Sequence, residues 1–253
     1  ALEQYRLSAN LYKEIGDIGN YASSLLGVGA MLEHLDETDA ALDAYLRALA
    51  MFREVGHKLL EARTLNNLGV LYERLGDKQK ALEYHELALP LRKIAGDRYG
   101  ESNSLNSIGS VYLDLGERSK AIDYFNRALA IRIEIDNKKA QSITLSNLGR
   151  TYEELGEREK ALEYLERALA LRKEVGDRGG VATVLNNIGM ATSGPGNEKK
   201  AIEYFEQSLA IPTELGLENR KATVLDNIGT VYSELNEFEK ALTYYRRALP
   251  LYR

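Results

Sequence analysis

Apolar residues recur along this chain every three or four positions, which is the spacing of one face of an α-helix. In residues 145–184 the first such face consists of Leu145, Leu148, Tyr152 and Leu155, and the second of Ala161, Leu162, Leu165, Ala168, Leu169 and Val175. The whole block returns when the sequence is shifted by forty residues, without an insertion or a deletion. A fixed period in this range indicates an array of structural repeats.

Each forty-residue block predicts two helices, A and B, joined by a very short turn. Gly156 interrupts the first apolar face, as a left-handed residue that closes a helix does. Glu157 and Asp177 stand where the caps of the two following helices are expected. Gly149 is expected to face Ala161 across the turn, so that the backbones of A and B approach closely. Such a hairpin buries its remaining apolar face only by stacking on its neighbours.

The period divides the chain into a single array over residues 1–253. The expected parts are helix B of a truncated repeat with a linker (residues 1–24), five repeats (residues 25–64, 65–104, 105–144, 145–184 and 185–224) and a truncated last repeat (residues 225–253). Neither end has the polar outer face of a terminal repeat, so we interpret the chain as a fragment of a longer protein. Apolar residues near the ends predict end-to-end self-association. They are Leu2, Tyr5, Leu249, Leu251 and Tyr252.

These repeats resemble those of the tetratricopeptide family. The matching positions are Leu145, the pair Leu148-Gly149 and Tyr152 in helix A, and Ala161, Leu165 and Ala168 in helix B. The usual period of the family is about thirty-four residues, and the forty-residue form is similar to the arrays of Pins-type spindle-orientation adaptors, kinesin light chains and bacterial signalling proteins. The resemblance implies an all-α fold, a right-handed α-α superhelix of thirteen antiparallel helices. Helix A would line its concave surface and helix B its convex one.

Polar residues recur in helix A just before the Leu-Gly pair. They are Asn66, Asn67, Asn106, Ser107, Asn147, Asn186, Asn187 and Asn227. Asparagine disfavours the helix interior because its side chain competes for backbone hydrogen bonds, so its recurrence suggests a compensating role. An amide offers donors and an acceptor to the backbone of an extended peptide, and the resemblance implies this role. The alternative is that the amides bridge neighbouring A helices or solvate the groove.

Two arginines of helix A, Arg63 and Arg150, are further candidates for a peptide-binding site. A guanidinium grips a carboxylate with two parallel hydrogen bonds. Arg150 stands one helical turn after Asn147, so the two would hold one acidic residue of a ligand and its backbone. The alternative for Arg150 is an ion pair with Glu153 or Glu154, and the acidic excess of the chain equally fits a basic peptide.

The composition excludes several classes of function. The net charge is −5 and no basic stripe is present, which disfavours nucleic acid as a partner. The chain has no cysteine, and its three histidines are far apart, so we expect neither a metal site nor a cofactor. No catalytic motif is recognisable, and we expect no enzymatic activity. No segment is apolar enough for a membrane span, and the absence of cysteine fits a cytoplasmic location.

The fifth repeat departs from the pattern and is expected to be the weakest. Thr192 replaces the helix A tyrosine, and Pro195 replaces a leucine. Pro212 stands where the two preceding repeats have arginine, and a proline inside a helix costs about 3 kcal/mol unless the helix bends. We expect helix A of this repeat to end early and helix B to bend near Pro212.

The repeats favour a protein-interaction scaffold that binds an extended peptide segment of a partner protein along helix A. The alternative is a regulatory or sensor segment of a larger bacterial signalling protein, which binds a small effector or its own effector domain.

Overall fold

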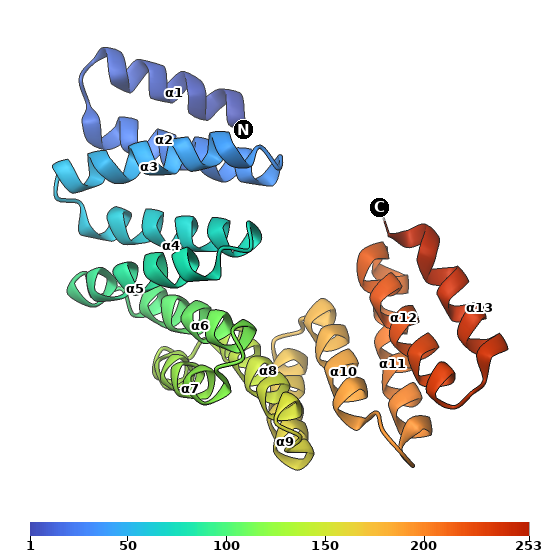
Figure 1. Ribbon diagram of the computed structural model, residues 1–253. Helices are drawn as coiled ribbons and strands as arrows, with labels where there is room; N and C mark the ends of the chain where they lie inside the picture. Colours follow the sequence, from blue (N-terminus) through green and yellow to red (C-terminus); the bar gives the residue numbers. More distant parts are fainter. Residues whose placement is uncertain (253) are drawn as a thin grey trace. The chain divides into compact units, whose positions relative to one another are not determined.

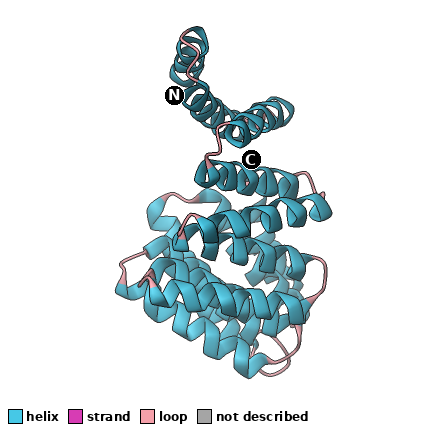
Figure 2. Ribbon diagram, turned by 90° about the vertical axis from the view of Figure 1, so that its left-hand side faces the viewer, coloured by secondary structure: helices cyan, strands magenta, loops and turns pink. Residues whose placement is uncertain are grey.

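The computed structural model describes residues 1–252. These residues form thirteen α-helices and one final 3-10 turn, without a strand (Figure 1, Figure 2). The helices are α1 (Leu2–Glu14), α2 (Ile18–His34), α3 (Thr38–Glu54), α4 (Lys58–Arg74), α5 (Lys78–Ile94), α6 (Arg98–Asp114), α7 (Arg118–Glu134), α8 (Lys138–Glu154), α9 (Arg158–Glu174), α10 (Arg178–Thr192), α11 (Glu198–Leu215), α12 (Glu218–Glu234) and α13 (Phe238–Ala248), followed by the turn Leu249–Leu251. The all-α prediction and the number of helices are confirmed. Even-numbered helices are the A helices, and odd-numbered helices are the B helices.

The A helices begin seven residues before the expected repeat boundaries. Residues 18–24, which the sequence assigned to a linker, instead form the first turns of α2. Asp17 caps this helix by accepting a hydrogen bond from the Asn20 amide at 3.0 Å. The sequence placed the start of this repeat at residue 25, where the regular apolar spacing of helix A begins. Most of the preceding residues of α2 are small or polar, so they did not extend the pattern.

The connections between helices follow one geometry. All but two of them contain three residues, and the middle residue has a positive φ. This residue is glycine in most connections, and Asp36, Asp136 and Asn236 take the same position elsewhere. Aspartate and asparagine tolerate this conformation better than other side chains. The conformation reverses the chain, so each helix runs antiparallel to the preceding one.

The third residue of a connection caps the next helix when its side chain is short. Asp77, Asp97 and Asn137 each accept a hydrogen bond from the backbone amide three residues later, at 2.9 to 3.1 Å. Glu157 forms no such bond and instead pairs with Lys160 at 2.5 Å. The expected cap at Glu157 is therefore wrong, and its longer side chain serves an ion pair instead.

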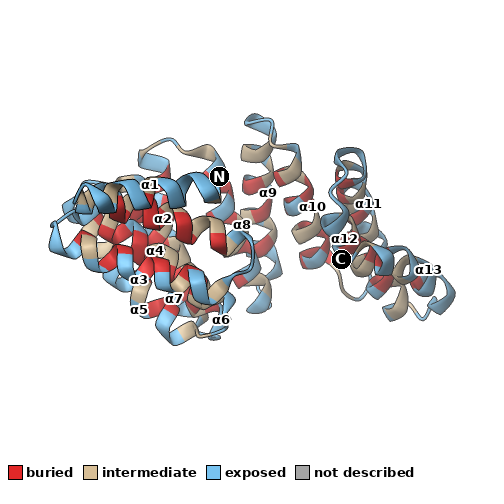
Figure 3. Ribbon diagram, turned by 90° about the horizontal axis from the view of Figure 1, so that it is seen from above, coloured by how far each residue is buried: buried red, intermediate tan, exposed pale blue. Residues whose placement is uncertain are grey.

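The chain divides into two compact units, Ala1–Ile131 and a second that begins at Arg132. The core of the first unit includes Tyr45, Phe52 and Leu68, and that of the second includes Phe205 and Ile228. Within each unit the buried residues lie on the faces that neighbouring helices turn toward one another (Figure 3).

One glycine of helix A in each of six repeats permits the close packing of helices A and B: Gly29, Gly69, Gly109, Gly149, Gly189 and Gly229. A Cβ atom at any of these six glycines would lie 2.5 to 2.7 Å from a side chain of helix B. At Gly149 the nearest atoms would be Cγ of Leu165 at 2.6 Å and the backbone oxygen of Ala161 at 3.2 Å. The predicted approach of Gly149 to Ala161 is thus confirmed.

Buried arginines join helix B to the next helix A, a feature that the sequence analysis did not predict. Arg92 is 8% exposed, and its Nη1 atom lies 2.6 Å from Oδ2 of Asp97. A Cβ atom at residue 100 would lie 1.6 Å from Nη1 of Arg92, so a larger residue there would displace this guanidinium. Arg172 pairs with Asp177 in the same way in the second unit.

Replacement of Asp177 by asparagine should reduce stability at neutral pH and much less in acid. The amide of Gly180 and the charge of Arg172 hold the pKa of Asp177 below its usual value. The aspartate charge therefore stabilises the fold above the unfolded pKa of about 3.9, and this contribution is lost as the pH falls through the lower, folded pKa. Asparagine retains the cap, as Asn137 shows. Urea denaturation of both proteins at neutral and acidic pH measures the difference, and a difference that persists in acid would contradict this assignment.

Helix A of the fifth repeat is altered as expected. Helix α10 has 15 residues, whereas the other A helices have 17, and the five residues 193–197 connect it to α11. The hydroxyl of Thr192 is buried without a described hydrogen-bond partner. In contrast, α11 continues through Pro212 to Leu215. The early end of α10 is confirmed, and the bend near Pro212 stays a prediction.

Hydrogen exchange should be faster in the fifth repeat than in the fourth. Tyr152 stacks on Tyr164 at a centroid distance of 5.3 Å in the fourth repeat, whereas Thr192 offers no ring at the corresponding position. We therefore expect the amides of residues 192–206 to exchange by local opening below the global free energy. Equal protection of these amides and those of residues 151–166 would contradict a weak fifth repeat.

Candidate functional site

The A helices form the inner layer of each unit, because successive A helices contact one another directly. These contacts join α2 to α4 and α4 to α6 in the first unit, and α8 to α10 and α10 to α12 in the second. All ten candidate residues lie on A helices: Arg63, Asn66, Asn67, Asn106, Ser107, Asn147, Arg150, Asn186, Asn187 and Asn227. The two arginines are exposed, and the other eight residues are half-buried. Their side chains are thus accessible at the surface of the A layer.

Two predicted residues of the first unit line one pocket. The pocket has a volume of about 630 Å³ and lies between α4, α6 and the end of α5. Its polar lining residues are Arg63, Asn67, Arg92, Asp97, Tyr99 and Asn103. We call it the Arg63 pocket. Two arginines and one aspartate give it a positive formal charge in a chain whose net charge is −5.

The two arginines of the Arg63 pocket differ in their partners. Arg92 is paired with Asp97, and its Nε atom is buried without a described hydrogen-bond partner. For Arg63, which is exposed, the described part of the chain shows no ion pair. The guanidinium of Arg63 is therefore available for a carboxylate, with the amides of Asn67 and Asn103 beside it. The sequence feature that indicates the buried Arg92 is Gly100. This small residue stands where the preceding repeat has the larger Leu60 and leaves space for the arginine side chain.

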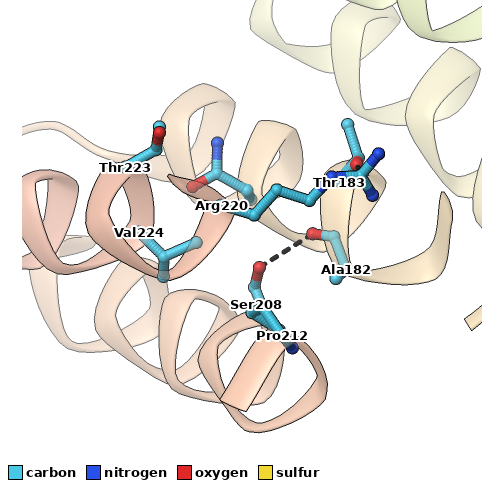
Figure 4. Close-up of a pocket in the computed structure, with 8 residues that line it drawn as sticks. Ala182, Thr183, Ser208, Pro212, Arg220, Thr223 and Val224 are labelled. Atoms are coloured by element: carbon cyan, nitrogen blue, oxygen red, sulfur yellow. Dashed lines mark hydrogen bonds between the residues drawn. The ribbon is translucent and has the colours of Figure 1, made fainter. Parts of the chain in front are cut away.

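A second pocket occupies the equivalent place in the second unit. It has a volume of about 260 Å³ and lies between α10, α11 and α12 (Figure 4). Thr183, Pro212 and Thr223 line it at positions 120 residues after Arg63, Arg92 and Asn103. We call it the Pro212 pocket. Asn186 also lines it. The same groove between adjacent repeats is therefore lined by two arginines and an aspartate in one unit and by Arg220 in the other.

Two of the candidate asparagines bind one another. The amide nitrogen of Asn227 donates to the amide oxygen of Asn186 at 2.8 Å, which joins α12 to α10. In the first unit, the Ser104 hydroxyl lies 3.5 Å from the amide oxygen of Asn66, a long contact between α6 and α4. The alternative interpretation, in which amides bridge neighbouring A helices, is thus observed at Asn186 and Asn227. Asn106 and Asn147 also interact within the protein.

Arg150 lies in an acidic environment. Burial and the neighbouring charge of Glu154 raise the pKa of Glu153, while Arg150 and Arg158 oppose this shift. Arg150 therefore acts on Glu153 electrostatically. Its guanidinium remains exposed on the A layer.

Residues 1–252 contain no helix long and apolar enough to cross a membrane. Within the same residues, no three side chains of histidine, cysteine, aspartate or glutamate are grouped as metal ligands.

The sequence profile of the tetratricopeptide repeat family matches residues 20–94, 100–174, 140–214 and 181–253. These segments cover nearly the whole chain, so the protein belongs to the tetratricopeptide repeat family. No curated protein sequence matches it.

Solved structures with the same fold have low sequence identity to this chain. Aspartyl phosphate phosphatase F from Bacillus subtilis is 16% identical with a TM-score of 0.78, over 98% of this chain and 63% of the phosphatase. A Rap protein complexed with Competence and Sporulation Factor is 17% identical with a TM-score of 0.73, over 99% of this chain and 70% of that protein. BtubC from P. vanneervenii is 19% identical with a TM-score of 0.62, over 99% of this chain and 89% of that protein. At these identities the likeness shows the fold alone, and the present chain spans less than two thirds of the phosphatase.

Proposed function

We propose that this protein is an interaction scaffold that binds an extended peptide segment of a partner along the A layer. The observation that carries the proposal is the Arg63 pocket, which brings Arg63 and Asn67 together in one concave site. A cationic side chain next to an amide suits a peptide, since the first binds an acidic side chain and the second binds the peptide backbone. The proposed location is the cytoplasm, because a chain without cysteine fits a reducing compartment.

The amides of the A layer act on the peptide backbone in this proposal. Asn67, Asn106, Asn147 and Asn187 recur at intervals of about forty residues and are half-buried. A half-buried amide loses less conformational entropy on binding than a mobile one. It offers hydrogen bonds that do not depend on the sequence of the ligand. Arg63 and Arg150 then supply preference for acidic residues at particular positions.

A regulatory segment of a larger bacterial signalling protein is the second candidate. Two structural neighbours favour it, the aspartyl phosphate phosphatase and the Rap protein complexed with Competence and Sporulation Factor. In this candidate the same A layer binds a small effector or the protein's own effector domain, in place of a partner protein. Selection of ligands from a random linear-peptide library and from a small-molecule library on the same protein distinguishes the two.

The double substitution Asn147→Ala with Arg150→Glu should weaken binding of the selected peptides and leave the melting temperature nearly unchanged. Both residues lie at the surface of the A layer, and substitutions at such positions usually change stability by no more than about 0.5 kcal/mol. Fluorescence polarisation measures affinity, and circular dichroism measures the melting temperature. A variant that loses binding because it unfolds would show that these residues are structural. Failure to select any peptide on the wild-type protein would contradict the proposed function.

A further inference from the structure

One position of helix B gives the Pro212 pocket a lining that differs from that of the Arg63 pocket. At this position the three preceding B helices have Arg92, Arg132 and Arg172, whose side chains lie against the next A helix. In α11 a proline takes the place, and its side chain is too short to fill the space. The Pro212 pocket therefore has a proline ring where the Arg63 pocket has the Arg92 guanidinium.

The facing helix has changed together with Pro212. Arg220 stands where the three preceding A helices have Gly100, Ala140 and Gly180. Its guanidinium donates to the backbone oxygen of Gly179 at 2.8 Å and lies 3.3 Å from the Thr183 hydroxyl. Figure 4 shows this side chain extending toward Thr183. Arg220 therefore lines the pocket, with its guanidinium held at α10.

The floor of the Pro212 pocket is apolar and its polar atoms are already paired. Ala182 and Val224 are 2% and 4% exposed, and Pro212 is buried beside them. The hydroxyl of the buried Ser208 donates to the backbone oxygen of Ala182 at 2.8 Å (Figure 4). A charged group on this floor would lie against Ala182, Pro212 and Val224, and burying a charge among apolar groups is costly. An aliphatic group loses no hydrogen bond there and removes apolar surface from water.

The rim suits a peptide backbone. The Asn186 amide oxygen accepts from Asn227, whereas its amide nitrogen has only a 3.8 Å contact with the Met190 sulfur. This nitrogen remains a donor for a backbone carbonyl, and the exposed hydroxyls of Thr183 and Thr223 lie on the same rim. A peptide held by Asn186 thus has a side-chain pocket directly beside its backbone.

We propose that the Pro212 pocket binds one aliphatic side chain, of the size of leucine or methionine, from the peptide that lies on the A layer of the second unit. This inference rests on the proposed function and adds a specificity to it. The Arg63 pocket selects an acidic side chain, and the equivalent Pro212 pocket selects an aliphatic one. Pro212 is then a specificity determinant rather than only a weak point of its helix.

The test uses amino-acid amides as probes and NMR of the alanine and valine methyl groups. N-acetyl-leucine-N-methylamide should shift the Ala182 and Val224 methyl signals saturably, whereas the alanine and glutamate analogues should not. Thr223→Trp places an indole at the rim and should weaken this binding at least tenfold. The matched control is Thr243→Trp on α13, because both threonines are exposed and donate to a backbone oxygen four residues earlier. A second closing variant is Pro212→Arg with Arg220→Gly, which recreates the pattern of Arg172 and Gly180.

The outcomes separate this inference from the proposed function. Leucine-specific shifts that both closing variants abolish support the pocket, whether or not peptides bind elsewhere. Absence of these shifts in the folded wild-type protein overturns the pocket assignment. If selected peptides still bind through Arg63 and keep their affinity in Thr223→Trp, the proposed function stands and the aliphatic pocket is wrong. If the leucine amide binds but no peptide does, the proposed function fails and the pocket stands as a small-molecule site.

Discussion

Gly149→Leu should lower the free energy of unfolding of the second unit by about 3 kcal/mol, the upper end of the usual cost of overpacking. The added side chain meets Leu165 at once, since even a Cβ atom would lie 2.6 Å from its Cγ atom. The backbone oxygen of Ala161, at 3.2 Å, prevents a simple side-chain adjustment. Helices α8 and α9 must therefore separate. Urea denaturation followed by circular dichroism measures the loss.

The control for this substitution is Arg150→Leu, at the next position of the same helix. Arg150 is exposed, so the change should alter stability by no more than about 0.5 kcal/mol. If Gly149→Leu were as stable as Arg150→Leu, the close approach of α8 and α9 would not exist in solution.

Arg63→Glu combined with Asn67→Ala should weaken peptide binding at least tenfold, while the melting temperature stays within the range of exposed substitutions. A hydrogen bond to a charged group contributes about 1.5–3 kcal/mol, and glutamate adds repulsion for an acidic ligand. A tenfold change corresponds to about 1.4 kcal/mol, so loss of the arginine alone accounts for it. Fluorescence polarisation with an acidic selected peptide measures this effect.

The matched control is Arg6→Glu on α1. Arg6 is exposed on a B helix of the same unit, and its substitution changes the net charge equally. Equal loss of affinity in both variants would show that only the overall charge matters, and the assignment of Arg63 to a specific pocket would be wrong. Affinity that falls only for the Arg63 variant, and less at high salt, supports a local charge interaction.

The helical repeat was predictable because its causes are local. The apolar spacing of residues 145–184 and the helix-closing Gly156 are visible in the sequence, and Gly149 marks the close approach of two helices. Asp36 and Asn236 show the limit of this reasoning. They take the same left-handed position as glycine, yet no glycine marks it in the sequence.

The candidate site was only partly predictable, because its contacts join residues about forty positions apart. The recurrence of Asn186 and Asn227 is visible, but their mutual hydrogen bond depends on the distance between α10 and α12. The buried Arg92 was missed for a similar reason, since an arginine at a helix end reads as solvent-exposed until Gly100 is seen to leave space for it. Pro212 was expected to bend its helix, and its place in the lining of a pocket depends on α10 and α12, which the local sequence does not show.

A crystal structure of the protein bound to the tightest selected peptide tests the peptide-scaffold proposal most directly. The proposal predicts an extended peptide on the A layer, with a peptide carboxylate at Arg63 and backbone atoms of the peptide at hydrogen-bond distance, about 3 Å, from A-layer amides such as Asn67. A peptide bound to the B helices, with the Arg63 pocket empty, would contradict it.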